Sequence, residues 1–137
     1  MMPIRLITLA VVAALSLGTA QAADGHWQGV ATTVAGAIDG VVAHFEAGDD
    51  KSARAALTEA YFGRFEDSKM EAAVRKEIGK DRAVEVEGMF SDIRKAMKAG
   101  DGAEVRRIAS QLKAALKTDG QALDAAKVSA DVYEVNQ

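Results

Sequence analysis

Carboxylates and a thioether are concentrated in one short stretch of the chain, YFGRFEDSKMEAAVRKEIG, residues 61–79. Carboxylate oxygens are ligands for hard cations such as Fe(II), Fe(III) and Mn(II), and a thioether suits copper. Glu66 lies seven residues after Glu59 and directly follows Phe65, and Met70 comes four residues later. Where a helix ends inside a bundle, such carboxylates can converge while half-buried. We therefore treat Glu66, Glu59 and Met70 as candidate metal ligands.

Further candidates lie on neighbouring predicted helices. Glu85, Glu87 and Asp92 can face the same region from the next helix, and Glu87 is the one we retain as a ligand candidate. His44 falls in the last turn of the first predicted helix, where a cation interacts favourably with the helix dipole. It could instead share a metal with Glu46 or with acids of a facing helix. Both interpretations of His44 stay open.

A purely structural interpretation accounts for most polar residues of the 61–79 stretch. Ser68 to Glu71 fits the capping box S-x-x-E, in which the serine side chain caps a new helix and the glutamate bonds back to the serine amide. Asp67 then favours the positive end of that helix. Of the acids in and around this turn, only Glu66 is left without a structural role.

Other kinds of chemistry are excluded by what the chain lacks. It has no cysteine, so c-type haem, iron–sulfur clusters and thiol chemistry are ruled out. It contains no Glu-x-x-His pair, HExxH, EF-hand loop, GxSxG or Walker loop. Acidic residues outnumber basic ones by 20 to 17, which does not favour nucleic acid as a partner. We expect a protein that is not an enzyme, and no small-molecule substrate is indicated.

The first 22 residues have the composition of a secretory signal peptide. Arg5 is their only charge, residues 6–17 form an apolar run, and Ala-Gln-Ala ends at Ala22 with small residues at −3 and −1. The run is too short to span a bilayer. We expect cleavage after about Ala22 and a periplasmic or secreted protein. Cleavage one residue later would make His26 the third residue, an arrangement that chelates Cu(II) or Ni(II).

The remainder of the chain predicts an all-α fold. Alanine, leucine, lysine and glutamate dominate, and apolar residues recur at intervals of three and four. We expect one domain over 23–137, folded as an antiparallel up-and-down four-helix bundle whose second helix is broken near Asp67–Ser68. The tail after about residue 128 is expected to fray. The predicted helical segments are about 27–47, 51–65, 70–78, 81–99, 103–117 and 121–128.

A faint repeat supports two helical hairpins. Residues 46–57 and 98–109 both read as a helix end, Ala-Gly-Asp, and a helix start. Gly48 and Gly100 suit the left-handed position that ends a helix, while Asp49 and Asp101 suit the N-cap of the next. Loops this short predict antiparallel neighbours. Separately, the sequence Thr-Asp-Gly at 118–120 predicts a helix end there.

Residues 60–101 contain a tyrosine-phenylalanine pair at 61–62, a phenylalanine-glutamate pair at 65–66 and a methionine-glutamate pair at 70–71, followed by an apolar-periodic helix. In this pattern they resemble the periplasmic N-terminal domain of bacterial high-affinity iron permeases. The resemblance covers about a third of the chain and does not include the membrane part that carries the Arg-Glu-x-x-Glu motif of those permeases. It implies a free-standing periplasmic domain that binds iron or docks to a permease, with Glu66 and Glu71 as ligand candidates and Met70 and Tyr61 as second choices. The matching residues are Tyr61, Phe62, Phe65, Glu66, Met70, Glu71, Ile78, Gly79, Glu87 and Phe90.

These patterns together predict a periplasmic protein that binds iron or another divalent metal and assists uptake through a membrane permease. Iron is the expected cargo, as Fe(II) or Fe(III), and copper is the less favoured one. The alternative is a structural or interaction bundle without metal, whose cationic face contacts a protein partner. The oligomeric state is left open by the sequence.

Overall fold

The computed structural model describes residues 25–131, and every regular element in that part of the chain is helical. The all-α prediction is therefore confirmed. The predicted signal peptide and the end of the tail lie outside the described residues. No helix within 25–131 is long and apolar enough to cross a membrane. The elements are α1 (His26–Glu46), α2 (Asp50–Thr58), the π-helix η1 (Glu59–Glu66), α3 (Met70–Ala73), the π-helix η2 (Val74–Ile78), α4 (Lys80–Lys98) and α5 (Gly102–Ala125).

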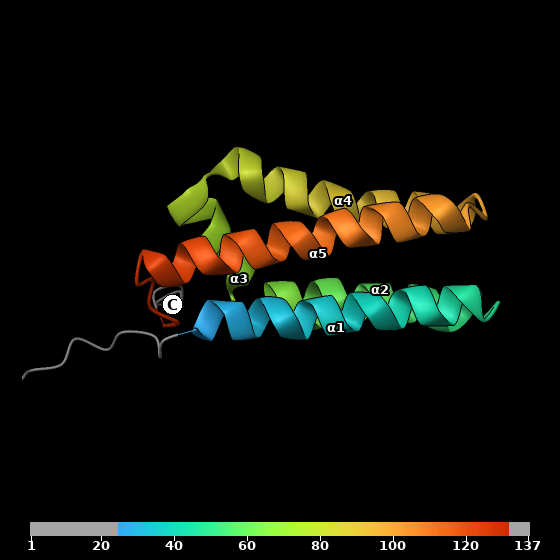
Figure 1. The fold of residues 1–137 in the computed structure, drawn as a ribbon, viewed down its shortest axis with the longest axis horizontal. Helices are drawn as coiled ribbons and strands as arrows, with labels where there is room; N and C mark the ends of the chain where they lie inside the picture. Colours follow the sequence, from blue (N-terminus) through green and yellow to red (C-terminus); the bar gives the residue numbers. More distant parts are fainter. Residues whose placement is uncertain (1–24, 132–137) are drawn as a thin grey trace, which may run out of the picture.

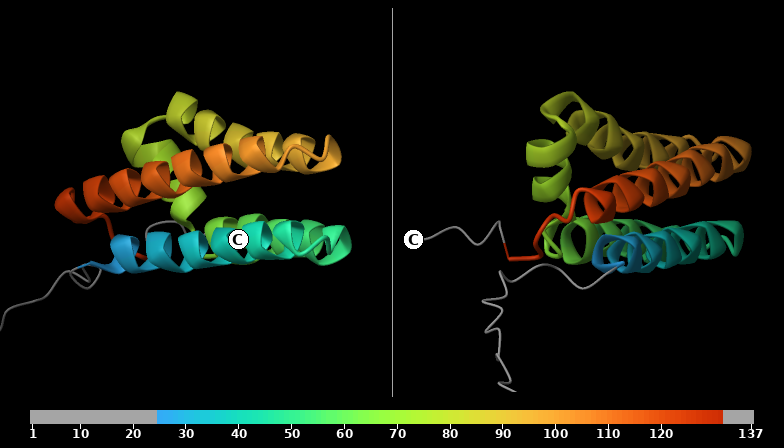
Figure 2. Two further views of the ribbon diagram at one scale, coloured as in Figure 1. Left: turned by 45° about the vertical axis from the view of Figure 1, so that its right-hand side comes forward. Right: turned by 60° about the vertical axis from the view of Figure 1, so that its left-hand side comes forward.

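The helices form two hairpins, one containing α1 and α2 and the other containing α4 and α5. They are joined by a crosswise segment that consists of α3 and η2. In Figure 1, α1 and α2 run side by side in one layer, and α4 and α5 run side by side in the other. The colours show that the long helices α1, α2, α4 and α5 alternate in direction along the chain. Figure 2 shows that α3 and η2 run from one layer to the other at one end of the molecule and are steeply inclined to the long helices. The long helices α1 and α5 contact each other along their lengths.

The two Ala-Gly-Asp turns have the conformation that the repeat predicts. Gly48 and Gly100 take positive φ angles of 78° and 69°. Asp49 and Asp101 each accept a hydrogen bond on their side chain from the backbone N–H three residues on, with N···O distances of 3.0 Å. Both hairpins are thus closed by the same local chemistry.

The break in the second helix lies where it was predicted, but the capping box there was wrong. Lys69, not Ser68, takes the N-cap position of α3, with a positive φ of 68°. Ser68 donates its hydroxyl to the Phe65 carbonyl, and its Oγ accepts from the Met70 N–H at 3.3 Å. The chain turns sharply here into the crosswise segment, so the cap moves one residue on. Glu71 is then free to pair elsewhere.

The predicted helix end at 118–120 was also wrong, since α5 continues to Ala125. Asp119 is buried against Arg82 of α4, with both carboxylate oxygens 3.0 Å from the Arg82 Nε. Gly120 lies against α1, where a Cβ would come within 2.8 Å of the Trp27 carbonyl oxygen. Both residues therefore serve the contacts of α5 with its neighbours.

The chain after α5 keeps a defined position as far as Val128, while most of the tail predicted to fray after about residue 128 lies outside the described residues. The Trp27 indole Nε1 donates to the Val128 carbonyl at 2.8 Å, and Val128 is buried. Asp124 accepts from the backbone N–H groups of Trp27 and Gln28 at 2.9 and 3.0 Å. These bonds hold the segment after α5 against the start of α1.

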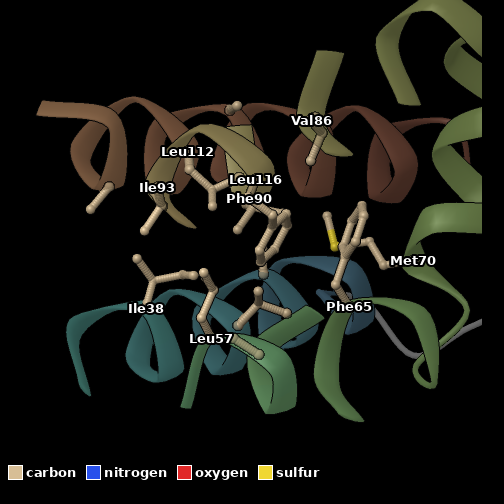
Figure 3. Packing of buried hydrophobic residues seen from close by; sticks show 14 of the residues in the cluster. Ile38, Leu57, Phe65, Met70, Val86, Phe90, Ile93, Leu112 and Leu116 are labelled. Atoms are coloured by element: carbon tan, nitrogen blue, oxygen red, sulfur yellow. The ribbon is translucent and has the colours of Figure 1, made fainter. Parts of the chain in front are cut away.

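A single apolar core lies between the two hairpins (Figure 3). The Phe65 and Phe90 rings stack within it with centroids 5.6 Å apart. Ile78 follows the buried Val74 by four residues, as Val74 follows the buried Met70, but it is 40% exposed. The largest fully buried side chains are Trp27, Phe65, Ile38, Leu57, Met70, Ile93, Leu112, Leu116, Leu123, Val34, Val41 and Val74.

Candidate metal centre

The crosswise segment brings two of the predicted acids together. Glu71 lies on α3, Arg75 one turn later on η2, and Glu87 on α4. Nη2 of Arg75 donates to Oε1 of Glu71 at 2.8 Å and to Oε1 of Glu87 in a very short contact. One guanidinium nitrogen therefore bridges the two carboxylates. We call Glu71, Glu87, Arg75 and the adjacent Tyr61 the Tyr61 cluster.

The electrostatics of the Tyr61 cluster favour retention of protons. Burial raises the pKa of Glu87, and a hydrogen bond with Glu71 and its charge raise it further, while Arg75 opposes the shift. Burial also raises the pKa of Tyr61, with added contributions from the charges of Glu71, Glu87 and Glu66. Three carboxylates thus act on one phenol oxygen. Removing protons from this cluster leaves negative charge that a cation would stabilise.

Aromatic rings form the wall beside the cluster. The Tyr61 ring meets Phe62 and Phe90 edge to face, with centroids 4.8 and 5.1 Å apart. A hollow of about 170 Å³ lies there, bounded also by Glu87 and Arg94. Phe62 is 54% exposed. The Glu87 carboxylate can therefore be reached from solvent through a small aromatic hollow.

The other predicted ligands lie apart from the cluster. Met70 is completely buried, and its side chain points into the core near Phe65 (Figure 3). Glu59 is exposed, lies 3.6 Å from Arg64 and covers Gly63. His44 is exposed in the last turn of α1, whose end is opposite to α3 in Figure 1.

Glu66 is not one of the paired acids, but it acts on Tyr61 through its charge. It is exposed at the end of η1, and its negative charge contributes to the raised pKa of Tyr61. Among residues 25–131, no three side chains of His, Cys, Asp or Glu are grouped closely enough to hold a metal ion. The cluster as it stands offers two carboxylates and a phenol oxygen, with Arg75 as their counter-ion.

The role of Arg75 was missed in the sequence. Its spacing of four residues from Glu71 is a standard signal for an ion pair along a helix. The approach of Glu87 could not be read from spacing, because it depends on how the crosswise segment packs on α4. Comparisons of the chain with protein-family models, curated proteins and solved structures found no match.

Proposed function

We propose that the protein is a periplasmic accessory protein that captures iron, or another divalent cation, at the Tyr61 cluster and passes it to a membrane permease. The observation that carries the proposal is the meeting of Glu71 and Glu87 beside Tyr61. Iron in either oxidation state accepts carboxylate and phenolate oxygens. The resemblance of residues 60–101 to the iron permease domain supports the same cargo.

Arg75 has a definite part in this mechanism. Without metal, its guanidinium compensates the two carboxylates. An entering cation takes over that compensation, so Arg75 moves aside, and the cation competes with protonation of Glu87, whose pKa is raised. Glu66, exposed close to Tyr61, supplies a further oxygen ligand during capture. Release of the cation restores the Arg75 contacts, which makes capture reversible.

The proposal includes the protein's surroundings and overall form. Export depends on a leader over residues 1–22, removed after about Ala22. The two hairpins form an antiparallel four-helix bundle with the crosswise segment at one end, as the alternating helix directions support. The protein acts by binding and transfer and is not an enzyme. Its expected partner is a membrane iron permease or another periplasmic uptake protein.

Calorimetry with Fe(II) under anaerobic conditions, and with Mn(II), tests the proposal. Glu71→Gln with Glu87→Gln should abolish binding while circular dichroism keeps its helical signal. The charge-matched control is Glu85→Gln with Asp92→Asn, two exposed acids of the same helix. Equal affinity in the cluster variant and the control would refute this site. Glu66→Ala should weaken binding to a smaller extent.

A second candidate function rests on exposed apolar side chains. Phe62, Ile78 and Val84 are 54%, 40% and 52% exposed, and they lie on η1, η2 and α4. Large exposed apolar residues favour a contact with another protein. In this alternative the protein is an interaction bundle without metal. Phe62→Ser would then abolish partner capture, and the Glu71, Glu87 variant would leave it unchanged.

A further inference from the structure

A second hollow, of about 460 Å³, lies between the start of α1 and the end of η1. From α1 it is lined by His26, Val30 and Thr33, and from η1 and the turn after it by Arg64, Asp67 and Ser68. None of these residues belongs to the Tyr61 cluster. Its volume is within the range of ligand sites.

His26 is the unexplained residue of this hollow. Within the described residues its Nε2 atom is buried and has no hydrogen-bond partner. The ring lies edge-on to Trp27, with centroids 4.8 Å apart and an interplanar angle of 82°. Buried polar atoms are nearly always paired, so an orphaned imidazole nitrogen calls for a partner that is a ligand or a solvent molecule. His26 itself lines the hollow, so a ligand bound there would lie against the imidazole ring.

The hydroxyl groups of the hollow can only accept. Thr33 donates its hydroxyl hydrogen to the Gly29 carbonyl at 3.1 Å. Ser68 donates its own to the Phe65 carbonyl at 3.1 Å. The Thr33 oxygen keeps lone pairs that a cation can use, whereas the Ser68 oxygen already accepts from the Met70 N–H.

The charges around the hollow also favour a cation over an anion. Asp67 is an exposed carboxylate at the end of η1, where the helix dipole is negative. The charge of Arg64 is offset by Glu59, 3.6 Å away. The backbone N–H groups of Trp27 and Gln28, which would otherwise attract an anion to the start of α1, are taken by Asp124.

We propose that this hollow binds a divalent transition-metal ion, with the His26 imidazole and the Asp67 carboxylate as protein ligands. Imidazole nitrogen selects metals such as Zn(II), Co(II) and Ni(II) over Mg(II) and Ca(II). The Thr33 oxygen and water complete the coordination. The site stands independently of the proposed iron capture, because it shares no ligand with the Tyr61 cluster.

The test is Zn(II) calorimetry, with Co(II) absorption as a second signal, on the full exported protein carrying Glu71→Gln and Glu87→Gln. In this variant the Tyr61 cluster has lost its two carboxylates, so the Zn(II) binding that is measured belongs to the hollow. The result is therefore separate from that of the proposed function. His26→Ala and Asp67→Asn should each weaken Zn(II) binding at least tenfold. His44→Ala removes the other histidine of the chain and should leave affinity unchanged.

Two outcomes would overturn the site. One is unchanged Zn(II) affinity after His26→Ala. The other is loss with His26→Ala but not with Asp67→Asn, which would assign the metal to a chelate at the chain's amino terminus. NMR of the imidazole nitrogens in protein with an unaltered hollow guards against misfolded variants. Zn(II) should shift the His26 signals and leave those of His44 in place.

Discussion

Asp119, in the last two turns of α5, accepts hydrogen bonds from the Arg82 Nε on both carboxylate oxygens, each at 3.0 Å. The Asp119 side chain is only 4% exposed, and Arg82 also reaches Glu85 on the solvent side at 2.9 Å. Burial raises the pKa of Asp119, and the Arg82 guanidinium opposes that shift. The pair joins the start of α4 to α5 next to the crosswise segment.

Removing one partner of this pair should destabilise the fold. Asp119→Ala leaves a guanidinium that is partly buried and has lost its main acceptor, and we expect a loss of about 1–3 kcal/mol in the free energy of unfolding. Urea unfolding measures it. Asp92→Ala breaks the exposed pair with Lys95 and should change stability by less than about 0.5 kcal/mol. Equal effects of the two changes would contradict the structural role of Asp119.

Asp124 caps α1 from a distant part of the chain. Asp124→Ala should cost about 1–2 kcal/mol, since two N–H groups in the first turn of α1 lose their acceptor. Amide hydrogen exchange should become faster at Trp27 and Gln28. Gln121→Ala, at an exposed position one turn earlier, is the control. If exchange at these two amides is unaffected by Asp124→Ala, the cap is not formed in solution.

Two glycine-to-alanine changes should act in opposite directions. Gly36→Ala adds a methyl group in open space on α1 and should stabilise by about 0.5–1 kcal/mol, because alanine favours the helix. Gly120→Ala has the same helical gain, but its Cβ would lie 2.8 Å from the Trp27 carbonyl oxygen. We expect a net loss of about 1–3 kcal/mol from overpacking. Thermal unfolding compares the two, and stabilisation by both would show that α1 and α5 pack less closely.

Interactions between residues close in the sequence could be predicted, whereas contacts between residues far apart in the sequence could not. The Gly48–Asp49 turn was readable because its hydrogen bonds join residues three apart. The same reasoning failed at Gly120, where glycine allows a close contact with Trp27 instead of ending a helix. Spacing likewise reveals the Glu71–Arg75 pair, whereas the approach of Glu87 depends on two π-helical segments that apolar periodicity does not indicate.

The Tyr61 cluster predicts a pH dependence of stability whose sign is fixed by Glu87. Its pKa in the folded protein is raised above the ordinary value of 4.5. The folded chain therefore holds this proton to higher pH than the unfolded chain does. The stability that the protonated carboxyl contributes is present at low pH and is lost as the pH rises through the folded pKa.

Glu87→Gln keeps a neutral side chain at every pH and isolates this contribution. The stability of the variant relative to the unaltered protein should rise as the pH increases above 4.5, the ordinary glutamate pKa. Carbon-13 NMR of the Glu87 carboxyl group measures the titration directly. Glu71→Gln should lower the Glu87 midpoint, because it removes the neighbouring negative charge. A Glu87 midpoint at or below 4.5 in the unaltered protein would mean that Arg75 outweighs both burial and Glu71.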